Sequence, residues 1–273
     1  MFSRRSVSRA MASPYLAWMA LFIIIPLLMV FWFGLTDSSG AFTLENVGAI
    51  MEATRYKALF LALELSLIST LICFLIAYPL ALILARTASS QGFIITIFIL
   101  PMWMNFLLRT YAWLTLLEGN GVINQLLKAL HLPTQSIINT PSAIVFGMVY
   151  NFLPFMILPL YNAVSRIDPA VLEAARDLGA GWWQTLLKVT LPLSLNGIIS
   201  GVTMVFIPAL TTFAISSLLG GSKLLLIGNV IESHFLGLNY DPHLGSGLSL
   251  VLLVFIIINM VVSSVSDAKQ KDA

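Results

Sequence analysis

The sequence has few charged residues. Charged types make up 10% of its 273 residues, whereas apolar types make up 59%. A soluble domain has about 25% charged and roughly 45–50% apolar residues, so this composition excludes a soluble enzyme and a disordered chain. The formal net charge is +2, which provides no basic surface for phosphates. The charge therefore also excludes a nucleic-acid-binding protein.

Cysteine is almost absent, and the motifs of common catalytic sites are missing. A single residue, Cys73, cannot form a disulfide framework, and three scattered histidines do not complete a Cys/His metal site. The sequence lacks the phosphate-binding loop G-x-x-x-x-G-K-[ST], the zinc motif H-E-x-x-H and the nucleophile motif G-x-S-x-G. We therefore expect no catalytic residue, no metal ion and no cofactor bound by this chain.

Long apolar runs dominate the sequence. A spanning helix needs about 20 mostly apolar residues, and no run alternates as the strands of a membrane barrel do. The sequence predicts an all-α membrane protein with one transmembrane domain over residues 15–266, an N-terminal tail 1–14 and a C-terminal tail 267–273. Six spans are predicted, at residues 15–35, 58–85, 93–117, 142–164, 196–220 and 248–265.

The positions of Lys and Arg predict the orientation in the membrane. Cytoplasmic segments carry an excess of these residues close to the span ends. The excess lies in both terminal tails and in residues 165–195 when the N-terminus is placed in the cytoplasm. Six spans then put both termini on the cytoplasmic side.

Charged residues inside predicted spans are rare. Only Glu64 lies well within a run, where burying a charge costs at least about 3 kcal/mol. It is either an interfacial carboxylate, hydrated or paired with a neighbouring helix, or part of a pathway for a cation. Arg109 lies near the outer end of the third run, where we expect an interface anchor or an ion-pair partner.

Aromatic and amide residues gather on the third and fourth runs. Trp and Tyr are frequent in the interface belt of a membrane protein. They can also line a cavity that binds an amine through cation–π contact. The candidates for a substrate pathway, besides Glu64, are Trp103, Asn105, Tyr111 and Asn151.

The cytoplasmic segment 165–195 predicts a helix–turn–helix elbow. Asp168 can cap a first helix and Pro169 suits its first turn. Gly179 ends that helix, and a second helix over residues 182–189 stops near Pro192. Small residues on the first helix would let a partner approach closely, so the elbow is a candidate docking surface.

The same segment carries a family signature. It reads E-A-A, three residues, Gly, nine residues and then V-T-L-P, and it resembles the signature of permease subunits of binding-protein-dependent ABC importers. The resemblance implies a type I importer permease fold whose elbow couples to an ATPase subunit. That subunit binds ATP and Mg²⁺ and hydrolyses the ATP. The implied coupling residues are Asp168, Glu173, Ala174, Ala175, Asp177, Gly179, Leu191 and Pro192.

Further segments resemble the first of the two permease subunits in spermidine/putrescine importers. These segments are residues 108–112, 153–156, 158–161 and 220–231. The resemblance implies a bacterial inner-membrane location and four kinds of partner: a second permease, two ATPase subunits, an extracytoplasmic substrate-binding protein and the lipid bilayer. Permeases for opines and other organic cations share much of this pattern and stay open as alternatives. A stand-alone secondary transporter would need an ion-coupling site, for which only Glu64 is present.

Overall fold

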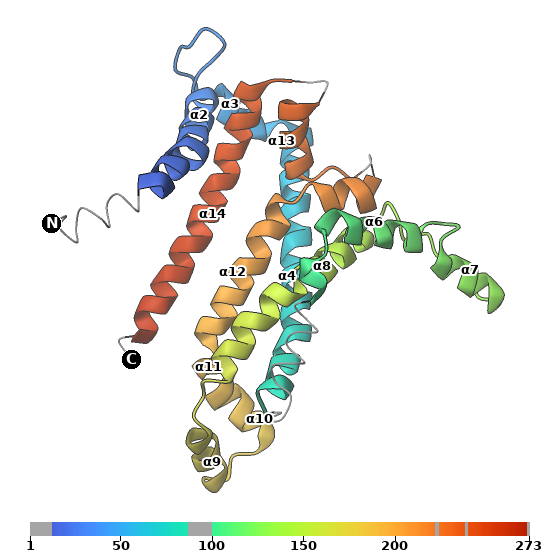
Figure 1. Ribbon diagram of the computed structural model, residues 1–273, viewed down its shortest axis with the longest axis vertical. Helices are drawn as coiled ribbons and strands as arrows, with labels where there is room; N and C mark the ends of the chain where they lie inside the picture. The colour runs from blue at the N-terminus through green and yellow to red at the C-terminus, as the bar shows by residue number, and fades with distance from the viewer. Residues whose placement is uncertain (1–12, 87–99, 222–223, 238–239, 272–273) are drawn as a thin grey trace, which may run out of the picture. The chain divides into compact units, whose positions relative to one another are not determined.

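The computed structural model describes residues 13–86, 100–221, 224–237 and 240–271 (Figure 1). Within these ranges the regular elements are helices joined by turns and loops, and one isolated antiparallel bridge pairs Thr36 with Phe42. The all-α prediction is therefore confirmed. The chain forms two compact units, one of residues 1–56 with 230–255 and the other of residues 57–229 with 256–273.

Four helices among the described residues are long and apolar enough to cross a membrane, and they match the first, second, fourth and sixth predicted spans. The first is Ser13–Gly34, which includes the π-helix η1 (Ala20–Ile24) and α2 (Ile25–Gly34). The other three helices are α4 (Ala53–Arg86), α8 (Pro141–Val164) and α14 (Pro242–Lys271). A bent helix pair adds a fifth crossing if it counts as one span.

The third predicted span is not continuous. Residues 93–99 lie outside the described residues, and the rest divides into the 3₁₀-helix η3 (Leu100–Trp103) and α6 (Phe106–Leu117). Asn105 has extended backbone angles, and its side chain accepts hydrogen bonds from the amides of Leu107 and Leu108 at 2.8 and 3.3 Å. It thus begins a new helix, because a cap supplies the bonds that a preceding turn would have made.

The fifth predicted span is also broken. Helix α12 (Leu195–Thr211) ends at Thr212, whose backbone is extended, and a π-helix η5 (Ser216–Gly220) follows. Asn229 of α13 (Ile227–Leu236) bridges the break. Its Nδ2 donates to the Phe213 carbonyl at 2.9 Å, and its Oδ1 accepts from the Ser216 hydroxyl at 2.6 Å. The same Oδ1 also accepts from the Leu226 amide at 3.1 Å, so this one side chain ties the start of α13 to the segment after the break.

Two glycines bring α12 against α8. A Cβ on Gly197 would lie 2.4 Å from Ala163 Cβ and 2.8 Å from the Pro159 carbonyl oxygen, and one on Gly201 would lie 2.7 Å from Met156 Sδ. The four-residue spacing of small residues places both on one helix face, where the two backbones approach closely. This pair forms the centre of the second unit.

Polar contacts hold the loop that follows the first span. The carbonyl of Thr36 accepts hydrogen bonds from Asn46 Nδ2 at 2.9 Å and from His243 Nδ1 at 2.6 Å. The Ser39 hydroxyl and the Ala41 amide donate to the Asp37 carboxylate and hold its pKa below the usual value. Helix α3 (Glu45–Gly48) and the 3₁₀-helix η2 (Ala49–Met51) follow this loop.

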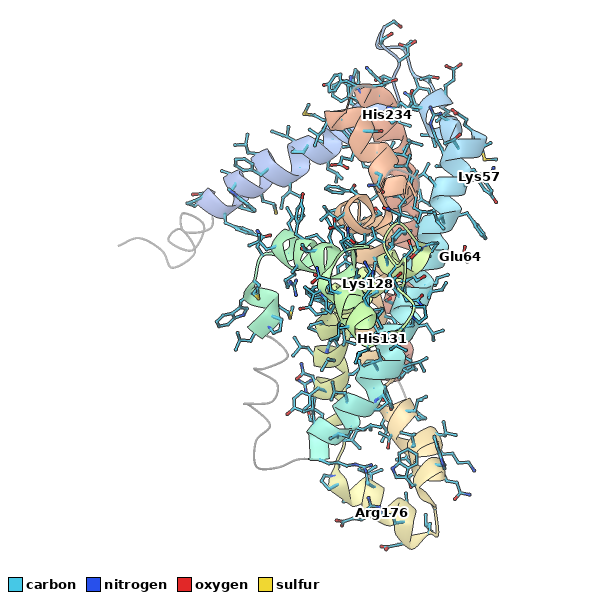
Figure 2. The ribbon with its side chains drawn as sticks, turned by 90° about the vertical axis from the view of Figure 1, so that its right-hand side faces the viewer. Lys57, Glu64, Lys128, His131, Arg176 and His234 are labelled. Carbon is cyan, nitrogen blue, oxygen red and sulfur yellow. The ribbon has the colours of Figure 1, made fainter. Side chains whose placement is uncertain are left out.

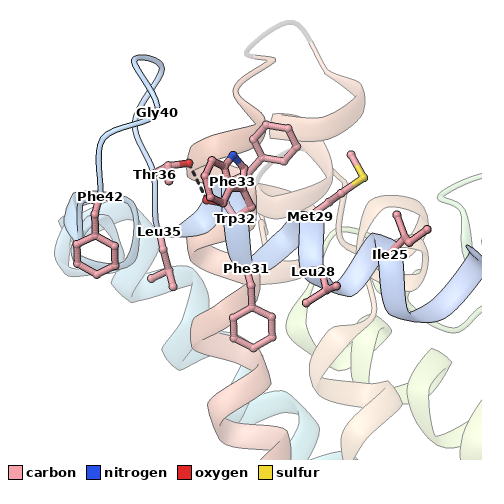
Figure 3. Close-up of a pocket in the computed structure, with 10 residues that line it drawn as sticks. All are labelled: Ile25, Leu28, Met29, Phe31, Trp32, Phe33, Leu35, Thr36, Gly40 and Phe42. Carbon is pink, nitrogen blue, oxygen red and sulfur yellow. Dashed lines mark hydrogen bonds between the residues drawn. The ribbon is translucent and has the colours of Figure 1, made fainter. Parts of the chain in front are cut away.

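An open apolar hollow of about 710 Å³ lies between α2 and this loop (Figure 3). Trp32 and Phe42 line it, and the Thr36 hydroxyl donates to the Trp32 carbonyl at 2.6 Å. Trp32 is 62% exposed and Phe42 is 72% exposed. The hollow is therefore an outer surface of the first unit rather than part of its core.

Candidate functional site

The candidate coupling elbow begins with α9 (Pro169–Asp177). The Asp168 carboxylate caps it by accepting a hydrogen bond from the Ala170 amide at 2.9 Å. Pro169 is the first residue of α9. Proline lacks a backbone N–H, and at this position the helix makes no hydrogen bond that would need one. The predicted start of this helix is confirmed in both residues.

Gly179 ends α9 in the left-handed conformation, with φ of +81°. Its amide donates to the Arg176 carbonyl at 2.8 Å, and the Ala180 amide donates to the Ala175 carbonyl at 3.0 Å. This pair of bonds is a Schellman motif, which turns the chain sharply and favours glycine at that position. The elbow therefore depends on Gly179 for its backbone conformation.

No residue of α9 is buried (Figure 2 shows Arg176 on this helix). Glu173, Ala174 and Asp177 are exposed, and Ala175 is half-buried. Leu178, which follows α9, is 89% exposed. An exposed apolar side chain beside small residues leaves room for another protein to approach this helix closely. Leu178 was not among the predicted site residues, because the sequence does not show which leucines of an apolar chain are exposed.

The second limb of the elbow runs from α10 (Trp182–Thr185) through the π-helix η4 (Leu186–Thr190) to α11 (Leu191–Leu193). It ends one residue after Pro192, as predicted, and the helix axis then bends by 69° into α12. The Ser194 hydroxyl at this bend lies 2.9 Å from the Tyr78 hydroxyl of α4. Leu191 and Pro192 thus belong to the limb that connects α9 to α12, and they lie outside α9 itself.

Glu64 lies on the exposed face of α4 (Figure 2). The apolar residues Phe60, Leu67 and Leu71 are exposed along the same stripe, three to seven positions away. Within the described residues, Glu64 forms no ion pair and no hydrogen bond. A carboxylate on an apolar stripe of a span is available to a group from outside this chain.

The other four pathway candidates occupy different settings. Trp103 is 84% exposed and Tyr111 is 53% exposed. Asn105 serves as the helix cap described above. Asn151 is buried in α8, where its Nδ2 donates to the Gly147 carbonyl at 2.9 Å. Asn151 is thus the one of these four whose side chain is buried, whereas Asn105 is exposed although its Oδ1 caps α6.

Arg109 differs from the prediction of an interface anchor. It is only 7% exposed, and its Nε has no hydrogen-bond partner among the described residues. The next residue, Thr110, lies 3.4 Å from Asn151, whose Oδ1 is also without a partner there. Arg109 lies in the first turn of α6, directly after the break at Asn105, rather than near the end of a continuous span.

Comparisons with known proteins identify the family of the chain. Residues 1–271 match a family described as the binding-protein-dependent transport system inner membrane component. The spermidine/putrescine transport system permease protein PotB of Escherichia coli (strain K12) is 37% identical over 246 residues, covering 87% of this chain and 89% of its own. The same protein of Salmonella typhimurium (strain SL1344) is 35% identical over 271 residues, covering 92% and 94%.

Solved structures share the fold. One is the crystal structure of a bacterial ABC transporter involved in the import of the acidic polysaccharide alginate. A chain of that transporter superposes with a TM-score of 0.78 at 22% identity, over 96% of both chains. The described helices are therefore arranged as in an ABC importer permease.

Proposed function

This chain belongs to the family of binding-protein-dependent transport system inner membrane components, and we propose that it carries polyamines such as spermidine and putrescine into the cell. It is a permease subunit of an ABC importer and an integral membrane protein. The substrate class is inferred from one observation: two spermidine/putrescine permeases are 35% and 37% identical to this chain over most of their length. No bond of the substrate changes during transport.

ATP hydrolysis on a separate subunit would supply the energy. The exposed surface of α9 is the part of this chain suited to receive that subunit. Its cap and its left-handed glycine fix the elbow, and Leu178 adds apolar area for docking. The proposed coupling residues are Asp168, Glu173, Ala174, Ala175, Asp177, Gly179, Leu191 and Pro192.

The assembly would contain a second permease, two ATPase subunits and a substrate-binding protein outside the membrane. The family description, which names binding-protein-dependent transport, supports the last of these. The excess of Lys and Arg supports an orientation with α9 and both termini in the cytoplasm. Glu64 would then lie toward the outer end of α4.

Glu64 is the proposed contact for a substrate ammonium group, with Trp103 and Tyr111 as aromatic contacts. Replacing Glu64 with glutamine keeps the shape and removes the charge. We expect the KM for spermidine uptake to rise about tenfold, since a hydrogen bond to a charged group contributes about 1.5–3 kcal/mol. Uptake kinetics in whole cells measure this change.

The matched control is Glu118→Gln, which removes an exposed acid outside the spans. It should leave the KM unchanged. An unchanged KM for Glu64→Gln, with the protein present at its normal level, would show that the carboxylate does not bind the substrate. Asn105 and Asn151 were also candidates, but the bonds they form here support structural roles.

Uptake of labelled spermidine, with and without this gene, tests the proposed function. Deletion should abolish uptake in a strain that has no other polyamine importer. Unlabelled putrescine should compete with the label, and an opine or an amino acid should not. Unchanged uptake after deletion would show that this protein does not import polyamines. The transporter would then be one for an opine or another organic cation.

A further inference from the structure

A groove of about 500 Å³ lies between the C-terminal half of α4 and the second limb of the elbow. Leu75, Tyr78, Leu82 and Arg86 of α4 line one wall, and Trp182 and Trp183 of α10 line the other. All these residues belong to the second unit. Of the proposed coupling residues, only Leu191 lines this groove, and none of those on α9 does.

The groove is apolar with one cation at its end. Arg86 is the last residue of α4 and is exposed, and it is the only charged residue in the lining. It forms no ion pair within the part of the chain that the structure describes. An unpaired guanidinium beside apolar walls attracts an anion that also has an apolar part.

The tryptophan pair gives the depth of the groove in the membrane. The two rings pack edge to face with centroids 4.5 Å apart, and Trp182 and Trp183 are 53% and 66% exposed. Indole rings are enriched where hydrocarbon meets headgroups, because the ring is apolar and its N–H needs a partner. The groove therefore opens at the level of lipid headgroups, on the side where α9 lies.

We propose that this groove binds an anionic phospholipid of the inner leaflet. One acyl chain would lie along Leu75, Tyr78 and Leu82, and the phosphate would meet Arg86. Basic pockets beside membrane helices on the cytoplasmic side bind such headgroups. A lipid is favoured over a protein segment, because the lining offers a single cation at the headgroup level and apolar walls elsewhere.

The bound lipid would support the elbow. Tyr78 of the α4 wall bonds Ser194, which follows the second limb at the 69° bend into α12. A lipid between α4 and α10 would fill the space next to that bond and hold the second limb in place. The inference rests on the membrane setting and the proposed orientation of the chain, and it does not depend on the identity of the substrate.

Photolabelling tests the proposal. The whole transporter, with its partner subunits, is placed in nanodiscs that contain a photoactivatable phosphatidylglycerol, and labelled peptides are mapped by mass spectrometry. We expect label on residues 74–86 and 182–191. Arg86→Gln should reduce it about fivefold, the effect of one cation near an anionic surface. Lys188→Gln, which removes an exposed cation of the same limb outside the groove, should leave it unchanged.

A second pair of variants tests whether the lipid needs the open volume of the groove. Leu75→Trp fills it and should reduce the label, whereas Leu71→Trp, one turn away on α4 and outside the lining, should not. The two leucines are 59% and 57% exposed, so the pair is matched. Equal labelling by phosphatidylcholine, label absent from both peptides, or a cross-link to another subunit would each overturn the proposal. Labelling requires no transport, so its failure is separate from a failure of the polyamine assignment.

Discussion

Replacing Gly179 with leucine is expected to abolish uptake while the chain stays inserted in the membrane at its normal level. Gly179 has φ of +81°, where any other residue costs about 1–2 kcal/mol. A Cβ at this position would meet nothing within 4 Å in the chain itself. The substitution therefore leaves the packing of this subunit intact, and it distorts and enlarges the surface offered to the ATPase subunit. Uptake should fall by at least about tenfold.

Gly181 provides the matched control. It lies two residues further along, its φ is −68°, and a Cβ there would also meet nothing within 4 Å. Gly181→Leu should retain most of the uptake. Immunoblots of membrane fractions show whether both variants are inserted equally. Normal uptake by Gly179→Leu would show that α9 does not couple transport to the ATPase subunit.

Replacing Gly197 with leucine is expected to destabilise the fold itself. The new Cβ would lie 2.4 Å from Ala163 Cβ and 2.8 Å from the Pro159 carbonyl oxygen. Helices α8 and α12 would have to separate, because a backbone oxygen cannot rotate away as a side chain does. Overpacking of this kind costs about 3 kcal/mol. The melting temperature of the purified transporter in detergent should fall, together with the amount of protein in the membrane.

Gly48→Leu is the control for this variant, because Gly48 is exposed and a Cβ there would meet nothing within 4 Å. Its melting temperature should match that of the unaltered protein. If Gly197→Leu also melts normally, α8 and α12 do not pack as closely as described. The two glycine variants thus separate coupling from folding: one stops transport in a stable protein, and the other removes the protein.

The parts of the fold that the sequence predicts well depend on local signals. The spans at residues 58–85 and 142–164 correspond to α4 and α8, because each is a long apolar run with helical ends. Asp168 and Gly179 act as the predicted start and stop of α9, because capping requires only nearby backbone groups. These features need no knowledge of distant residues.

The broken spans could not be predicted in this way. Hydropathy is averaged over a window, so a run can score as one span although a single cap such as Asn105 divides it into two helices. At the second break, the Asn229 side chain bonds the Phe213 carbonyl and the Ser216 hydroxyl, which lie 16 and 13 residues away in the sequence. Arg109 is buried four residues after the other break, which its position in an apolar run does not indicate. Such long-range compensation appears only in three dimensions.

The candidate site, too, has one part that could be predicted from local sequence signals and one part that could not. The elbow could be predicted, because its caps and its family signature are local. The pathway candidates could not be assigned from residue type, because Trp103 is exposed whereas Asn151 is buried. Leu178 was missed for the same reason. Its exposure depends on where α9 ends rather than on any pattern of residues.

The close contact between α8 and α12 has a mechanical consequence. Both limbs of the elbow are connected to this one helix pair. Four residues separate the end of α8 at Val164 from the start of α9, and α11 leads into α12 through Ser194. The elbow and the helix pair therefore form a closed ring of connected segments. Because Gly197 and Gly201 let α12 pack closely on α8, a force applied to α9 would be expected to move these two helices together.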